Sequence, residues 1–273
     1  MSTPLRLEAP AKLNLGLRVV GRRPDGHHEL DSVFVLLDLA DRLLLLPGCS
    51  GLRVEGHGAA DLPLGAGNLA WRGLVAGLDT EPELACLTLE KQIPSAAGLG
   101  GGSSDAAAAW RLGRAWRGLP DRADADELAQ LAAIGADVPF FAAGVVAARV
   151  TGIGERIEPL DLPARTVVLV HPPFGLSTAA IFAELRPDEW GALDNDLLAP
   201  ARRLRPEVDT VFERMARAGG EPRLSGSGPT VYSLFDDRER GTALAATLRG
   251  VGLHVTLTRT RIAPTSIETI QEE

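Results

Sequence analysis

IPSAAGLGGGSSDAAAAW, residues 93–110, is the stretch of sequence that decides the fold. Its four glycines, Gly98 and Gly100–Gly102, lie between an expected strand at 84–93 and a run of alanines with high helix propensity. Glycine loses more backbone freedom on folding than any other residue, so four in one corner indicate a need for bare backbone. A strand, glycines and a helix start together form a geometry that binds phosphate, because free amides and the helix dipole both favour an anion.

Two familiar phosphate loops do not fit these glycines. No lysine follows them, as a P-loop requires, and the third glycine of a dinucleotide fingerprint is replaced by Ser103 or Asp105. The alternative without a ligand is a flexible turn or close packing of helix on strand. We expect a helix from about Asp105 to Trp116, with its N-cap among Ser103, Ser104 and Asp105. The alanines at 106–109 would give that helix a slim face for close packing.

Composition limits the class of protein. The 273 residues are 45% hydrophobic and 23% charged, which is typical of a globular protein with one large or two smaller domains. The net charge of −8, without a basic tail, argues against a nucleic-acid partner. We find no signal peptide and no apolar run of membrane-spanning length, so no membrane partner is expected. Two cysteines cannot form a disulfide framework or a four-cysteine zinc site, and a reducing cytoplasmic location is expected.

The order of predicted elements gives the fold class. Strands and helices intermix without strict βαβ alternation, which favours an α+β fold in two domains. A weak boundary at 151–163 divides an ATP-binding domain at 1–155 from a substrate-binding domain at 156–273, with a last strand near 253–262 free to return to the first domain. A capping box at Asp124 and Glu127 predicts a helix that Gly135 closes. Strands are predicted at 5–20, 32–37, 42–46, 84–93, 147–150, 166–171 and 253–260, and helices at 69–78, 178–184 and 206–218.

Several stretches resemble one enzyme family. P-x-A-A-G-L-G-G-G-S-S-D-A-A at 94–107 resembles the phosphate loop of the GHMP kinases. PAKLNLGL at 10–17, RPDGHHEL at 23–30, GADVPFF at 135–141 and LSGSGPTV at 224–231 resemble, in this order, motifs of the 4-diphosphocytidyl-2-C-methyl-D-erythritol kinases within that superfamily. The resemblance implies a two-domain GHMP kinase architecture with mixed sheets and packed helices, and ATP with Mg²⁺ as cofactors. It further implies transfer of the γ-phosphoryl of ATP to the 2-hydroxyl of the cytidine-linked methylerythritol, in the non-mevalonate route to isoprenoids.

Two other readings remain open at this point. Another GHMP small-molecule kinase, such as a mevalonate or homoserine kinase, would share the phosphate loop but lack the paired PAKLNLGL and PDGHHEL stretches. A non-catalytic binding module would share the amino-terminal fold, but the acidic balance of the chain argues against it.

The resemblance assigns Lys12 and Asp137 as the catalytic pair, and the residues themselves support this. Lys12 is one of only two lysines, the other being Lys91, and it lies in an apolar strand pattern with Asn14 on the same face. A charge there needs a partner or a substrate. Asp137 precedes an apolar VPFF segment, and an acid in such a setting can serve as a general base. In the reaction that the resemblance implies, it would either accept the proton of the substrate hydroxyl or help Lys12 to stabilise charge in a loose transition state. The ordinary alternatives are a solvated strand lysine and a turn or cap aspartate.

The remaining site residues follow from the resemblance. The metal ligands are not fixed by the sequence, although Ser104 is one candidate. ATP is expected at Pro94, Ser95, Ala96, Ala97, Gly98, Leu99, Gly100, Gly101, Gly102, Ser103 and Ser104, and the substrate at Asn14, His27, His28, Thr178 and Phe182.

Several positions carry further expectations. His27 stands where the family has a tyrosine that forms one wall of the cytosine pocket, and a planar imidazole would stack there over a smaller area. Ala96 stands where glycine is common, and alanine suits that position only with a negative φ. Gly226 and Gly228 would either bring amides to the ligand or form a tight strand-entry turn. The sequence shows no metal-ligand spacing for His57, His171 and His254, which are interpreted as scattered structural residues.

Overall fold

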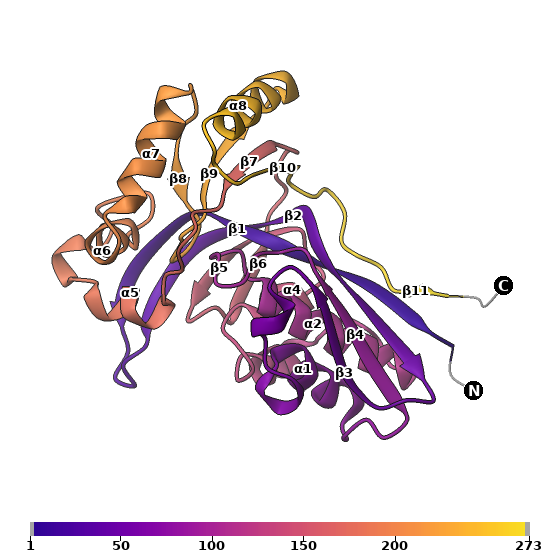
Figure 1. The fold of residues 1–273 in the computed structure, drawn as a ribbon. Helices are drawn as coiled ribbons and strands as arrows, with labels where there is room; N and C mark the ends of the chain where they lie inside the picture. The colour runs from indigo at the N-terminus through magenta and orange to yellow at the C-terminus, as the bar shows by residue number, and fades with distance from the viewer. Residues whose placement is uncertain (1–2, 271–273) are drawn as a thin grey trace.

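The computed structural model describes residues 3–270, which form two β-sheets and their covering helices (Figure 1). The seven-stranded first sheet has the order β11-β1-β2-β4-β3, with β5 also paired to β2 and β6 to β5. Its strands are β1 (Leu5–Arg22), β2 (His28–Pro47), β3 (Gly51–Gly56), β4 (Ala85–Lys91), β5 (Ala147–Gly152), β6 (Arg156–Pro159) and β11 (Glu268–Thr269). The predicted α+β class is confirmed.

A long β1–β2 hairpin forms the centre of this sheet. The sequence predicts two strands at 32–37 and 42–46, but β2 is continuous over 20 residues. The strand continues because it changes partner: residues 30–35 pair with β5 and residues 42–47 pair with β4. The residues between the two predicted strands, which include Asp41, therefore stay extended, because the segments before and after them are both paired in the sheet.

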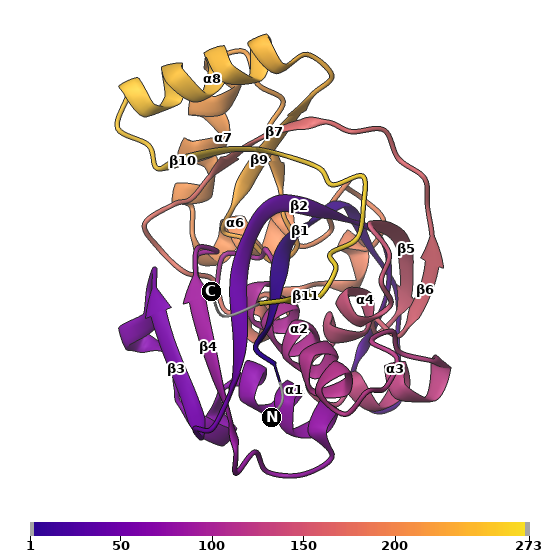
Figure 2. The same cartoon turned by 90° about the vertical axis from the view of Figure 1, so that its right-hand side faces the viewer.

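Four helices pack on one side of the first sheet (Figure 2). They are α1 (Leu69–Leu78), α2 (Gly101–Trp116), α3 (Ala125–Leu131) and α4 (Val138–Ala142). The capping box is confirmed, since Asp124 Oδ1 accepts from Glu127 N at 2.9 Å and Glu127 Oε2 accepts from Asp124 N at 3.0 Å. The expected slim face of α2 is confirmed as well, because Gly73 and Gly77 of α1 lie directly against its backbone.

The second sheet has four antiparallel strands in the order β10-β7-β9-β8. Its strands are β7 (Thr166–Val170), β8 (Arg223–Leu224), β9 (Val231–Phe235) and β10 (Val255–Arg259), and its helices are α5 (Thr178–Glu184), α6 (Leu198–Leu204), α7 (Glu207–Arg217) and α8 (Arg238–Gly250). Short 3₁₀ turns occupy Ala59–Asp61, Gly65–Gly67 and Pro187–Glu189. The sequence did not predict α6 or α8.

Two details bear on the expected organisation. Strand β10 pairs with β7 in the second sheet, and the chain then returns to the first sheet, where Thr260 forms a bridge with Leu37 of β2 and β11 pairs with β1. In addition, β6 pairs with β5, so the first sheet continues to Pro159, beyond the expected limit at residue 155. Both features depend on pairing between segments that are distant in sequence or too short to show a pattern.

The two sheets meet through a shared apolar core. Leu13 of β1, Ile93, and Leu99 of the glycine loop pack with Leu169 and Tyr232 of the second sheet. The Tyr232 hydroxyl donates to the carbonyl of Asn14 at 2.7 Å, which ties β9 to β1 beside the loop. The glycine loop is therefore held between the sheets and not on an open surface.

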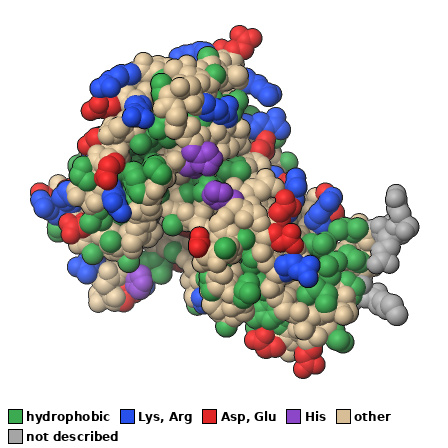
Figure 3. All heavy atoms as spheres, viewed as in Figure 1, with side chains coloured by type: hydrophobic (Ala, Val, Ile, Leu, Met, Phe, Trp, Pro, Cys, Tyr) green, Lys and Arg blue, Asp and Glu red, His purple; other side chains and the backbone are tan. Residues whose placement is uncertain are grey.

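Three histidines gather at this junction, contrary to the expectation that they are scattered. The ring centroids of His171 and His254 are 5.1 Å apart, and those of His57 and His254 are 6.4 Å apart. Figure 3 shows histidine side chains on the surface between the two halves of the molecule. His57 follows β3 while the other two flank β7 and β10, so only the packing of the two sheets unites them.

The two cysteines form a disulfide between the turn after β2 and strand β4. Cys49 and Cys86 have Cα atoms 5.2 Å apart. A reducing compartment does not predict this bond, and the expected location stays a prediction. Among residues 3–270, no helix has the length and apolar character needed to cross a membrane.

Candidate active site

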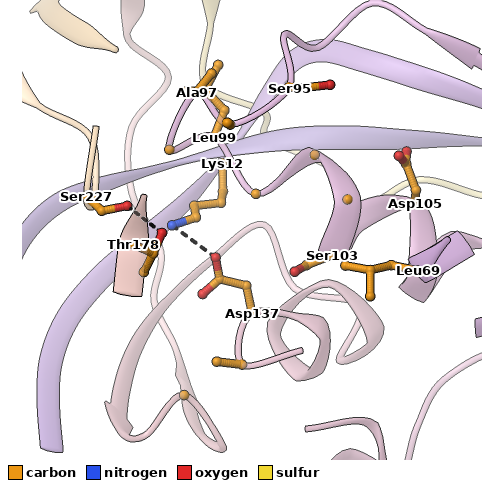
Figure 4. Close-up of a pocket in the computed structure, with 18 of the residues that line it drawn as sticks. Lys12, Leu69, Ser95, Ala97, Leu99, Ser103, Asp105, Asp137, Thr178 and Ser227 are labelled. Carbon is orange, nitrogen blue, oxygen red and sulfur yellow. Dashed lines mark hydrogen bonds and ion pairs between the residues drawn. The ribbon is translucent and has the colours of Figure 1, made fainter. Parts of the chain in front are cut away.

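A cavity of about 550 Å³ opens where the glycine loop, the first sheet and the second sheet converge (Figure 4). Its walls include Lys12, Asn14 and Asp137 from the first part of the chain and Thr178 and Phe182 from the second. The loop contributes the largest share, with every residue from Pro94 to Gly102 and also Ser103. The cavity thus joins a bare-backbone loop to a charged pair and an aromatic side chain.

Lys12 reaches the cavity because β1 is irregular at this point. The β1–β2 register shifts between Pro10 and Lys12, and a bulge of this kind redirects the side chain that follows. Lys12 N donates to the carbonyl of Leu99 at 2.9 Å, which fixes the strand against the glycine loop. With its side chain only 6% exposed, Lys12 is not the solvated strand lysine of the alternative reading.

The Lys12 ammonium has three neighbours. Its Nζ donates to Asn14 Oδ1 at 2.6 Å, lies 3.2 Å from Asp137 Oδ2, and sits 4.5 Å from the ring centroid of Phe34. Asn14 is held in turn by its donation to Ser32 Oγ at 3.0 Å. These contacts fix the position of the cation, and the remaining direction faces the cavity.

Asp137 precedes α4 but does not cap it. It occupies the N-cap position without a side-chain capping bond, and its carboxylate pairs with Lys12 instead. The side chain is 29% exposed, so it is accessible from the cavity. The cap alternative is therefore excluded, and a carboxylate in this setting can accept a proton from a bound hydroxyl.

The glycine loop enters its helix earlier than predicted. Helix α2 begins at Gly101, and its N-cap is Gly100 with φ 69° and no side-chain capping bond. The expected capping residues Ser103 and Ser104 lie inside the first turn. The amides of the first helical turn have no partner within the helix, so the start of α2 offers them, together with the helix dipole, to an anion in the cavity.

The early start of α2 separates the two serines, because successive helical residues point about 100° apart. Ser103 lines the main cavity, whereas Ser104 lies on another side of the helix with Arg111 and Thr265. Ser104 therefore does not line the main cavity, and its expected contact with the nucleotide or its metal stays a prediction.

Ala96 also departs from its expectation, since its φ is +52° rather than negative. Gly98 and Gly100 are left-handed as well, with φ 73° and 69°. An L-residue with a side chain is strained in this region by about 1–2 kcal/mol. The loop is thus held in its shape by its surroundings and not by local preference.

The second glycine turn, at 224–230, supports the loop from the other sheet. Ser225 Oγ donates to the carbonyl of Gly98 at 3.0 Å, and Thr230 N donates to the carbonyl of Ala97 at 3.3 Å. Gly226 lines the cavity with φ 54°, and Gly228 has φ 77°. The turn therefore leads into strand β9 and places Gly226 at the cavity wall, and a contact of its amides with a ligand stays a prediction.

The predicted substrate residues are brought together only in part. Thr178 and Phe182 line the cavity, and Thr178 Oγ1 shares a 2.8 Å hydrogen bond with Ser227 Oγ. His28 stacks on Phe182 with ring centroids 5.3 Å apart and an interplanar angle of 23°. Burial, with the nearby charge of Arg22, lowers the pKa of His28, so its imidazole is neutral at physiological pH.

His27 does not form the expected pocket wall. Its side chain is 67% exposed in the hairpin turn, where Nδ1 lies 3.3 Å from Asp25 Oδ1. A different aromatic residue, Trp190, meets His28 edge-on at 6.0 Å. Sequence analysis missed Trp190 because nothing in its local pattern distinguishes it from a residue of the core.

Comparison with known proteins agrees with this geometry. The model of the GHMP kinases N terminal domain matches residues 68–145, and that of the GHMP kinases C terminal domain matches residues 179–252. A 4-diphosphocytidyl-2-C-methyl-D-erythritol kinase of Dinoroseobacter shibae is 41% identical over 279 residues, covering 90% of this chain and 91% of its own. Its Thermus thermophilus counterpart is 39% identical, with 89% and 92% covered.

A solved structure shows the same relationship in three dimensions. The crystal structure of a 4-(cytidine 5'-diphospho)-2C-methyl-D-erythritol kinase has a TM-score of 0.77 at 35% identity, covering 93% of this chain and 98% of its own. The chain therefore belongs to the 4-diphosphocytidyl-2-C-methyl-D-erythritol kinase family of the GHMP kinases.

Proposed function

We propose that this protein transfers the γ-phosphoryl of ATP to the 2-hydroxyl of 4-diphosphocytidyl-2-C-methyl-D-erythritol, giving the 2-phosphate and ADP. The observation that carries the proposal is the Lys12–Asp137 pair, 3.2 Å apart, at the cavity wall beside the start of α2. Relatives with this activity in their names cover nine-tenths of the chain at about 40% identity, which supports this substrate over mevalonate or homoserine.

The residues of the cavity divide into distinct roles. The loop at 94–103 holds the triphosphate with backbone amides, since bare backbone can approach the phosphates closely. Asp137 accepts the proton of the 2-hydroxyl as the new O–P bond forms and the bond from the γ-phosphorus to the bridging oxygen of ADP breaks. Lys12, fixed by Asn14, stabilises the charge on the transferred phosphoryl group.

The substrate lies on the side of the cavity formed by the second part of the chain. Phe182 stacks on the cytosine, and the neutral His28 next to it offers a hydrogen bond to the base. Thr178 and Ser227 offer hydroxyl groups to the part of the substrate beyond the cytosine. His27, at an exposed turn, has no role in this arrangement.

Magnesium is expected to accompany ATP. The cavity wall offers the Ser103 hydroxyl and the Asp137 carboxylate, oxygen ligands of the kind that Mg²⁺ takes in small number while keeping several waters. These residues fit the ion, which would neutralise phosphate charge when bound. We also propose that the enzyme acts in the cytoplasm and on a free small molecule.

One assay tests the function. Purified protein is supplied with ATP, Mg²⁺ and, separately, the cytidine-linked methylerythritol, mevalonate or homoserine, and ADP release is followed together with mass analysis of the product. We expect turnover with the cytidine compound alone. Turnover with mevalonate or homoserine instead would assign a different GHMP kinase, and ATP binding without turnover on any alcohol would contradict an enzymatic role.

A further inference from the structure

Lys91 is the second of the two lysines, and the transfer chemistry does not use it. It ends β4 with 5% exposure, and its Nζ donates to Asp41 and, at 2.6 Å, to Asp105 Oδ2. Both carboxylates are buried, with 0% exposure for Asp41 and 3% for Asp105. One ammonium thus lies between two carboxylates away from water. Burying these three charges is costly, so a gain in stability alone does not explain why the chain places them here.

The three side chains hold both ends of the glycine loop. At the start, Asp41 Oδ1 accepts from Gln92 N at 2.5 Å and from Ile93 N at 2.8 Å, where β4 ends. At the far end, Lys91 reaches Asp105, which lies in the second turn of α2. The segment between these anchors is 94–104, and all of it except Ser104 lines the cavity.

The loop between the anchors needs such support. Ala96, Gly98 and Gly100 all adopt left-handed conformations, and residues in sparsely populated conformations persist only where surrounding structure determines them. The Lys91 Nζ also lies 3.5 Å from the position that a Cβ would take on Gly101, the first residue of α2. The network is therefore in contact with the end of the helix that would receive the phosphates.

We propose that Asp41, Lys91 and Asp105 are positioning residues that clamp the glycine loop at both ends and thereby set the affinity for ATP. The inference rests on the proposed function, because it takes the loop as the site of the triphosphate. Since these side chains act on the geometry of the loop and not on the transferred group, their loss is expected to weaken nucleotide binding more than it slows the chemical step at saturating ATP.

The charges of the network suggest a conservative replacement. Burial raises the pKa of Asp105 well above its ordinary value, despite the favourable charge of Lys91. Burial also opposes the charge of Lys91, but Asp105 and Asp41 outweigh it and raise the pKa of the lysine. One lysine thus faces two carboxylates, and Asp105 is the one whose negative charge is less favoured. An asparagine at this position keeps an acceptor for Lys91 without the charge.

The experiment compares four variants with the wild type by calorimetric titration of a non-hydrolysable ATP analogue with Mg²⁺, with thermal unfolding measured in parallel. Asp41→Ala is the decisive variant, because Asp41 accepts from the amides at the start of the loop and from Lys91, which reaches the far anchor, but does not line the cavity. Asp41→Asn keeps the side-chain volume and serves if the alanine variant does not fold. Asp105→Asn is the conservative replacement. Arg111→Met, which removes a partly buried ion pair to Asp121 from the same helix α2, is the matched control.

We expect the Kd of the analogue to rise at least about tenfold in Asp41→Ala, because small misplacements of a binding loop have large effects. Asp105→Asn and Arg111→Met are expected to stay within about twofold of the wild type. Unchanged affinity in a folded Asp41→Ala or Asp41→Asn protein overturns the inference, as does an equal loss in Arg111→Met. A wild-type protein that does not bind the analogue would instead contradict the proposed function.

Discussion

The side chain of Lys12 shows how a single residue acquires a role that its sequence position does not dictate. Alternation along β1 places it on the same face as Asn14, which the sequence indicated. The register shift at Pro10–Lys12 and the bond from its amide to Leu99 aim it at the cavity, and its contact with Asp137 spans 125 residues of chain. The charge is retained in a buried position because each neighbour compensates part of its desolvation.

The proposed catalytic pair, Lys12 and Asp137, gives the prediction at this scale. Lys12→Met and Asp137→Asn each remove a charge at similar volume, and kcat is expected to fall at least about a hundredfold in either, the low end for a positioned acid or base. The double variant should lose less than the product of the two effects, because groups that act together fail together. Steady-state ADP release and analogue titration separate turnover from ATP binding, which should change far less.

Asp31→Asn is a suitable control for this prediction. It breaks the exposed ion pair between Asp31 and Arg149 on the same sheet, outside the cavity, and should leave kcat unchanged. Near-normal turnover in Asp137→Asn would exclude proton acceptance by this residue, while a loss in Asp137→Asn with normal turnover in Lys12→Met would assign the reaction to the acid alone.

At the scale of elements, the position of helix α2 depends on its contact with α1. A Cβ on Gly73 would lie 2.0 Å from the carbonyl oxygen of Ala106, and one on Gly77 would lie 2.3 Å from that of Trp110. Bare backbone on α1 therefore meets the alanine face of α2, and the two helices approach more closely than side chains would allow. This contact seats α2 on the sheet with its first turn at the cavity.

Substitution of Gly73 tests this packing. Gly73→Ala improves intrinsic helix propensity but forces the helices apart, so we expect it to lower the free energy of unfolding by about 1–3 kcal/mol, as overpacking does. Gly250→Ala is the control, because Gly250 ends α8 with nothing within 4 Å of its Cβ position. That variant should be neutral or slightly stabilised. Equal stability of the two variants in urea denaturation would show that α1 and α2 can separate without cost.

At the scale of the molecule, the two sheets share a core, a glycine turn and a cluster of histidines. We propose a first domain that ends after β6 and regains β11 at its edge, and a second domain between them. At the junction, each ring nitrogen of His171 shares a hydrogen bond with a threonine hydroxyl. Nε2 lies 3.0 Å from Thr256 Oγ1, and Nδ1 lies 3.4 Å from Thr230 Oγ1. The Thr230 amide also donates to the carbonyl of Ala97, so the junction lies directly behind the glycine loop.

The junction gives the protein a predictable response to acid. Burial, reinforced by the nearby His254 and His57, lowers the pKa of His171 from 6.5 to about 4. The unfolded chain therefore binds this proton at a higher pH than the folded protein does. The stabilising contribution is complete above pH 6.5 and falls as the pH drops toward 4, by up to about 3 kcal/mol.

Unfolding measured between pH 7 and pH 4 checks this response. The slope of stability against pH should flatten in His171→Asn, which cannot take up the proton, and should persist in His27→Asn at the exposed hairpin turn. An unchanged slope in His171→Asn would show that other groups govern acid unfolding.

The sequence by itself determined the parts that depend on local preference. The helices at 69–78 and 178–184 were predicted with the bounds observed, the capping box at Asp124 was found, and the glycine corner was placed between a strand and a helix. The order of the motifs from residue 10 to residue 231 was sufficient to indicate the family. Such signals are readable because a cap, a periodic face or a motif is contained in a few neighbouring residues.

Only the tertiary structure decided the features that depend on contacts between distant segments. Helix α2 starts at Gly101 despite the low helix propensity of glycine, at a place where a Cβ on Gly101 would lie 3.1 Å from Ile93 and one on Gly102 would lie 3.4 Å from Leu69. Ala96 adopts a positive φ and His27 points to solvent for reasons that lie in the surrounding fold. The Asp41–Lys91–Asp105 clamp and the histidine cluster join segments that are far apart along the chain, and local sequence carries no information about such neighbours until the chain has packed.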